Sequence, residues 1–191
     1  MSDKNVYEWH AKWMKVGFHD AFIDDPRTVG IGLFWQCKPI KEAYVEWRGL
    51  SGVRNVLEEG GDREEFADEC KRTVKWMENG CLDPIGYHLY YVENLSQDVL
   101  CVPYSVPCVS QKVVDILKEA CPEDVEAFRL SINFETEKKY YILNLTKGLR
   151  EDAFLKNGLG EINMCRLIRD GEYGEDITKI LVSEKVIKKL Q

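Results

Sequence analysis

The second half of the chain contains apolar runs whose residue types are typical of strands. β-branched and aromatic residues fill 125–134 and 140–145, and the polar run 135–139 between them predicts the connection of a hairpin. Shorter apolar runs predict further strands at 85–92, 162–168 and 180–182. The pattern therefore predicts a mixed or mainly antiparallel sheet.

In the first half, two aromatic-rich runs are also expected to be strands. They cover 28–35 and 43–47, with Lys38-Pro39 as a break between them. Two prolines within 101–109 favour an edge strand or an extended connector, because proline cannot donate a ladder hydrogen bond. The charged, glycine-containing stretch 170–176 predicts a loop.

Three stretches carry the period and the end signals of helices. Asp62 and Glu65 form a capping-box-like start, apolar residues follow at helical spacing, and Gly80 predicts the end. A second helix is expected over 110–120, capped by its serine. A third is expected from Ser183 to the end of the chain.

A short internal similarity and the order of the elements set the fold class. Residues 109–117 align with 182–190, each as a strand end that turns into a Ser-capped helix, which fits reuse of a favourable turn. Strands and helices in this order predict an α+β fold with a few flanking helices. We expect 1–84 to be an aromatic-rich region with the acidic helix and 85–191 to be an α+β domain, the two forming one compact unit.

The net charge of −7 is concentrated in one segment. Between residues 58 and 69 Arg63 is the only base, and the acids form a candidate partner-binding surface: Glu58, Glu59, Asp62, Glu64, Glu65, Asp68 and Glu69. Such a surface suits a basic protein and opposes nucleic-acid binding, which depends on Lys and Arg. The same residues also fit the solvated face of a helix. An alternative partner surface is aromatic and comprises Trp35, Tyr44 and Trp47.

Candidate chemistry is sparse. The seven cysteines form no C-x-x-C pair and lie mainly in apolar runs, which predicts reduced thiols. No thiol stands at ligand spacing from His10, His19 or His88, so no metal is expected, and no cofactor or catalytic motif occurs. A cysteine–histidine nucleophile assembled by the fold stays open, although Cys101 and Cys108 have apolar neighbours, which raise a thiol pKa.

The sequence also bears on location. No run approaches the roughly 20 apolar residues of a membrane helix. The N-terminus lacks the basic-then-apolar order of a secretory signal. We therefore expect a cytoplasmic protein without a membrane partner.

Three stretches of the second half occur in an order found in a known family, at 106–117, 139–145 and 180–190. In these stretches the chain resembles the Imm11 (DUF1629) family of bacterial polymorphic-toxin immunity proteins. The resemblance runs from about residue 85 to the end, and the first eighty residues carry no signature of it. The basic stretch 146–150 departs from the family, which often has acids soon after the preceding strand. The resemblance implies an α+β structure, no cofactor, no catalytic residues and action by binding.

The leading hypothesis is therefore an immunity protein that binds and neutralises a cognate bacterial toxin, for which a basic nuclease is one candidate. Two alternatives remain open. One is a small enzyme with a thiol or carboxylate site that spacing does not reveal. The other is a structural or regulatory interaction module with no toxin partner.

Overall fold

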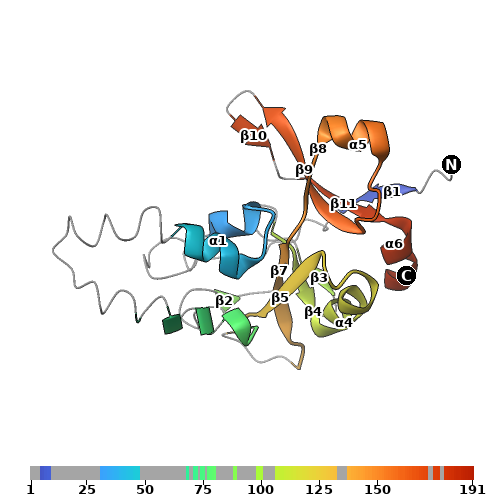
Figure 1. Cartoon of the computed structure of the whole chain (residues 1–191). Coiled ribbons are helices and arrows are strands. Elements are labelled where there is room, and N and C mark those ends of the chain that lie inside the picture. Colours follow the sequence, from blue (N-terminus) through green and yellow to red (C-terminus); the bar gives the residue numbers. More distant parts are fainter. Residues whose placement is uncertain are drawn as a thin grey trace, which may run out of the picture.

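The computed structural model confirms an α+β protein with two main sheets (Figure 1). It describes residues 5–9, 31–47, 68, 71–72, 74–75, 77–80, 88–89, 98–100, 106–132, 137–171, 174–176 and 179–191. The two sheets contact each other through β7 and β9, and both contribute to one hydrophobic core.

The first sheet is antiparallel and has the strand order β3-β4-β7-β5. Its strands are β3 (Val99–Leu100), β4 (Cys108–Ser110), β5 (Val125–Arg129) and β7 (Tyr140–Leu145). β5 and β7 form the predicted hairpin, with Phe128 opposite Ile142. β7 is almost wholly buried, because it is paired on both edges and its side chains are covered by α4, η1 and β9.

The second sheet has the order β1-β11-β9-β10, and β8 pairs with β9 in parallel. Its strands are β1 (Val6–Glu8), β8 (Gly148–Arg150), β9 (Met164–Gly171), β10 (Gly174–Asp176) and β11 (Ile180–Ser183). β9 and β11 confirm the strands predicted at 162–168 and 180–182. A separate parallel pair joins β2 (His88–Leu89) to β6 (Ser131–Ile132), and the rest of the strand predicted at 85–92 lies outside the described residues.

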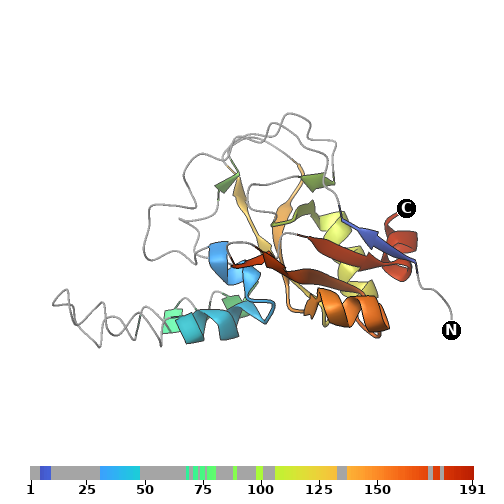
Figure 2. The ribbon, with the colours of Figure 1, turned by 90° about the horizontal axis from the view of Figure 1, so that it is seen from above.

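Three helices flank the two sheets (Figure 2): α5 and α6 contact strands of the second sheet, and α4 contacts strands of the first. They are α4 (Gln111–Ala120), α5 (Glu151–Asn157) and α6 (Glu184–Leu190). α4 and α6 contact each other and bury Val114, Leu117 and Val186 in the main core. α5 covers the opposite face above a smaller cluster that contains Leu159 and Leu181. The predicted helices at 110–120 and from Ser183 are confirmed.

The internal similarity corresponds to two like strand-to-helix turns. Ser110 joins β4 to α4 with φ −72° and ψ 164°, and Ser183 joins β11 to α6 with φ −73° and ψ 155°. Neither serine side chain caps its helix. The Ser110 hydroxyl donates to Asp98 at 2.9 Å, and the Ser183 hydroxyl donates to Asn163 Oδ1 at 3.2 Å. Each serine therefore holds a neighbouring segment instead of the helix end.

The strands predicted at 28–35 and 43–47 are wrong. The described part of the first run is a 3-10 helix, η1 (Ile31–Trp35), and the second belongs to the helix α1 (Ile40–Trp47). Ile40, Ala43 and Tyr44 share one helical face and are all buried. Their i, i+3, i+4 spacing outweighs the strand propensity of Tyr and Val, because burial of that face decides the conformation.

Two further expectations fail in detail. The predicted loop at 170–176 is the end of a hairpin, because β9 continues to Gly171 and pairs with β10. Within 101–109, β4 lies between β3 and β7 and is not an edge strand. Pro107 precedes β4, and its carbonyl accepts a hydrogen bond from the Leu143 amide at 2.9 Å, a contact that does not involve the N–H that proline lacks. Pro103 lies outside the described residues.

Candidate interaction site

Residues 31–47, which we call the α1 segment, pack against the first sheet. Phe34 and Tyr44 are fully buried, and the Phe34 ring meets Phe128 of β5 edge-to-face at 6.5 Å between ring centroids. η1 also contacts β7. The α1 segment is therefore part of the folded body.

A buried amide and a carboxylate fix the start of α1. Asn144 of β7 is fully buried and donates through Nδ2 to the Lys38 carbonyl at 2.9 Å and to Glu126 Oε2 at 2.8 Å. The same Glu126 oxygen accepts the Ile40 amide at 2.8 Å. A carboxylate at the first turn of a helix satisfies an otherwise unpaired N–H and complements the helix dipole. Glu126 and Asn144 thus hold the helix start on the sheet.

A buried arginine holds the other end of the α1 segment. Arg166 of β9 is fully buried, and its Nε donates to the Phe34 carbonyl at 3.2 Å. Burial lowers the pKa of Arg166 to about 10, while nearby Cys37 raises it. Cys37 itself has φ 53° and lies against Gly148, where a Cβ would come within 2.9 Å of the Cys37 sulfur. Glycine at 148 is therefore needed for this close approach.

The C-terminal end of the helix that follows the acidic segment is tied to the same body. Asp68 and the described residues between 71 and 78 are helical, which agrees with the predicted helix, whose start at Asp62 lies outside the described residues. Glu78 forms an ion pair with Lys41 of α1. Gly80, with φ 68°, accepts the Arg129 amide of β5 through its carbonyl at 3.1 Å. This helix therefore ends against both α1 and the edge of the first sheet.

Only one of the acids predicted to bind a partner lies in the described part. The Asp68 side chain is 68% exposed and pairs with Lys71 at 2.9 Å. The hydrogen bond from Lys71 and the charge of its ammonium group lower the pKa of Asp68. The other members of the predicted surface lie outside the described residues: Glu58, Glu59, Asp62, Glu64, Glu65 and Glu69.

The prediction of an alternative aromatic surface is wrong for Tyr44. Tyr44 is fully buried in the core, so it is not available to a partner. Trp35 is partly buried in η1. Trp47 ends α1, and its side chain lies outside what the structure describes. The outward face of α1 instead presents Val45, which is 53% exposed, among charged side chains.

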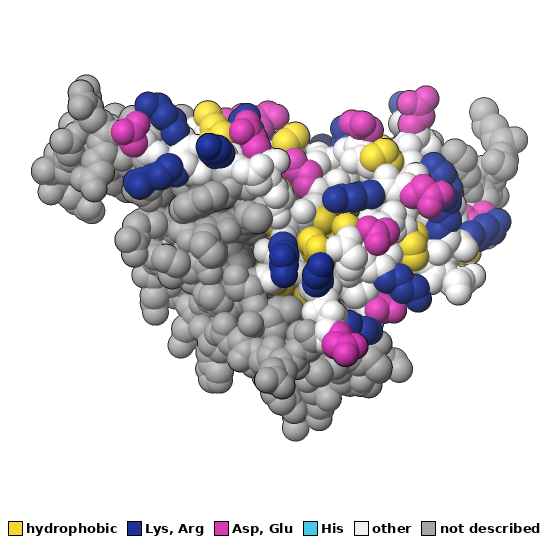
Figure 3. Space-filling view, turned by 90° about the horizontal axis from the view of Figure 1, so that it is seen from below, with side chains coloured by type: hydrophobic (Ala, Val, Ile, Leu, Met, Phe, Trp, Pro, Cys, Tyr) yellow, Lys and Arg dark blue, Asp and Glu magenta, His cyan; other side chains and the backbone are white. Residues whose placement is uncertain are grey.

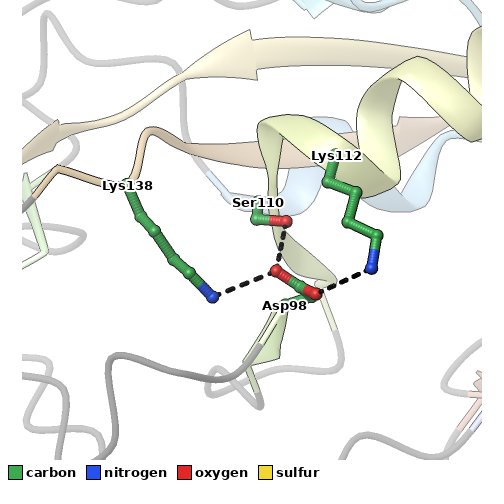
Figure 4. A network of polar contacts seen from close by, with 4 residues as sticks. All are labelled: Asp98, Ser110, Lys112 and Lys138. Atoms are coloured by element: carbon green, nitrogen blue, oxygen red, sulfur yellow. Dashed lines mark hydrogen bonds and ion pairs between the residues drawn. The ribbon is translucent and has the colours of Figure 1, made fainter.

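The described surface carries both signs of charge in close alternation, as Figure 3 shows for one face. The described residues include as many Lys and Arg as Asp and Glu, so the net charge of −7 comes from the others. Asp98 shows the local balance (Figure 4), because it accepts hydrogen bonds from Ser110 and from Lys138 at 3.1 Å and lies 3.6 Å from Lys112. Burial opposes ionisation there, but these hydrogen bonds outweigh it and lower the pKa of Asp98.

The described cysteines are poorly placed for nucleophilic chemistry. Burial raises the pKa of Cys121 and of Cys165 to about 12, and it raises that of Cys108 further. Burial also raises the pKa of the half-buried Cys37, against the opposing effect of Arg166. All four are free thiols. In the described part of the chain, no three His, Cys, Asp or Glu side chains are grouped as a metal would require, and no helix is long and apolar enough to cross a membrane.

Sequence reasoning missed the buried polar residues that organise the body. Asp124 is one of them, because its Oδ2 accepts the Asn163 amide at 2.7 Å and the Met164 amide at 3.2 Å at the start of β9. Asn144 and Arg166 each interrupt an otherwise apolar strand run. A single polar residue inside such a run is the signal that points to a buried, hydrogen-bonded role.

Comparison of the chain with protein-family models, curated proteins and solved structures gives no significant match.

Proposed function

We propose that this chain is an immunity protein that binds and neutralises a cognate bacterial toxin in the cytoplasm. The observation that carries the proposal is where the resemblance to immunity proteins falls. Its three stretches contain β4 with α4, then β7, then β11 with α6. All of them contribute side chains to the main hydrophobic core, including Val109, Leu143 and Val186. The resemblance thus concerns residues that pack together, which favours a shared domain over scattered similarity.

The proposed partner is a basic protein, and its proposed contact is the acidic segment 58–69. Because the described residues are balanced in charge, the long-range field of the chain comes from the remaining residues, and most of the excess lies in this segment. A nucleic-acid-cleaving toxin needs Lys and Arg to hold phosphates. An acidic surface would attract such a protein and increase the rate of encounter.

Binding is favoured over thiol catalysis by the state of the described cysteines. A catalytic thiol works as a thiolate and needs a lowered pKa. Burial has the opposite effect on Cys37, Cys108, Cys121 and Cys165. These thiols suit a packed core, so we assign them no chemical role.

Co-expression tests the proposal directly. The chain is produced together with the product of the neighbouring gene, and growth rescue and co-purification are both scored. We expect rescue together with a stable complex. Rescue without a complex, or turnover of a small substrate by the purified chain, would instead favour an enzyme.

Charge variants then test the proposed contact. Six acids are changed to their amides in one variant: Glu58, Glu59, Glu64, Glu65, Asp68 and Glu69. A matched control changes six exposed acids elsewhere that carry no ion pair in the described structure: Glu42, Asp115, Glu123, Glu137, Asp152 and Glu161. Both variants alter the net charge equally, so their difference isolates position.

We expect association of the first variant to slow by about tenfold or more at low salt and to lose most of its salt dependence, because steering acts on the encounter rate. The control should keep most of the wild-type rate. Equal effects of the two variants would mean that net charge matters and the segment does not. Stopped-flow association kinetics at several ionic strengths provide the measurement.

A further inference from the structure

We draw no further inference here: the strongest candidate, the outward face of α5 where Leu155 is 78% exposed near the Arg150 ion pairs with Asp170 and Glu175, carries nothing because nothing in the described structure shows what covers it.

Discussion

Replacing Asn144 with Asp tests how the α1 segment is held on the first sheet. The Asn144 amide nitrogen lies 2.8 Å from Glu126 Oε2 and 2.9 Å from the Lys38 carbonyl. Asn144→Asp replaces this donor with an oxygen, so two carboxylates meet and the Lys38 carbonyl loses its partner. Like charges about 4 Å apart repel by about 4 kcal/mol at an effective dielectric constant of about 20. A lost hydrogen bond adds about 1 kcal/mol.

The expected loss in the free energy of unfolding is therefore about 4–5 kcal/mol, which is a large part of the stability of an ordinary domain. Protonation of either carboxylate removes the repulsion. The folded variant then binds more protons than the unfolded chain, so its stability should rise as the pH falls from 7.5 to 5.5. The wild-type protein, which has an amide at this position, lacks this contribution.

Urea denaturation at both pH values measures the loss, and hydrogen exchange of the amides in 31–47 locates it. A matched control is Asn157→Asp on exposed α5, for which we expect a change of about 0.5 kcal/mol or less. If Asn144→Asp does not fold, Asn144→Leu removes the same hydrogen bonds without adding a charge and should still speed exchange in the α1 segment. A loss below 1 kcal/mol in Asn144→Asp that does not change with pH would refute the assigned contacts, as would unchanged exchange in Asn144→Leu.

Three further predictions concern the rest of the body. Asp98→Asn should lower the free energy of unfolding by about 1 kcal/mol at pH 7. Because the pKa of Asp98 in the folded protein lies below the ordinary value of 3.8, the difference between variant and wild type should fade as the pH falls below that value. Denaturation at several pH values measures it. Val186→Ala should lower the free energy of unfolding by about 2 kcal/mol, whereas Lys188→Ala on the exposed side of α6 should change it little. Equal melting temperatures of the two variants would contradict the packing of α6. Under denaturing conditions all seven thiols of freshly purified protein should react with a thiol reagent. In the native protein Cys37 should react first among the described cysteines, and early modification of Cys108, Cys121 or Cys165 would contradict their burial.

The sequence predicted those parts of the fold whose signals are local. The hairpin of β5 and β7 has strands rich in β-branched and aromatic residues and a polar connection, so its pairing needs no distant information. α4 shows an apolar stripe long enough to define a helical period. The run 43–47 is too short for this, because five residues fit both periods, and the buried face of α1 depends on a sheet nearly a hundred residues later.

The candidate site was less predictable for the same reason. The position of an acid-rich segment is visible in the sequence, but whether an aromatic residue faces solvent depends on tertiary packing, and Tyr44 is buried. Asn144 and Arg166 stand out as polar residues in apolar strands, yet their partners Lys38 and Phe34 lie more than a hundred positions away. Spacing along the chain therefore identified candidates without identifying their contacts.

The charge distribution divides the molecule into a balanced body and an acidic remainder, and this division bears on how a partner would be recognised. Charges on the body are largely neutralised by neighbours, as in the pairs Glu78–Lys41 and Glu119–Lys189. Such exposed pairs contribute little to stability and produce only a short-range field. Long-range attraction depends on the uncompensated excess, most of which lies between residues 58 and 69. Under the proposed function, a basic partner would be drawn first to that segment and not to the balanced body. The helix that follows the segment is anchored at its described end, where Glu78 pairs with Lys41 of α1 and the Gly80 carbonyl accepts the Arg129 amide of β5.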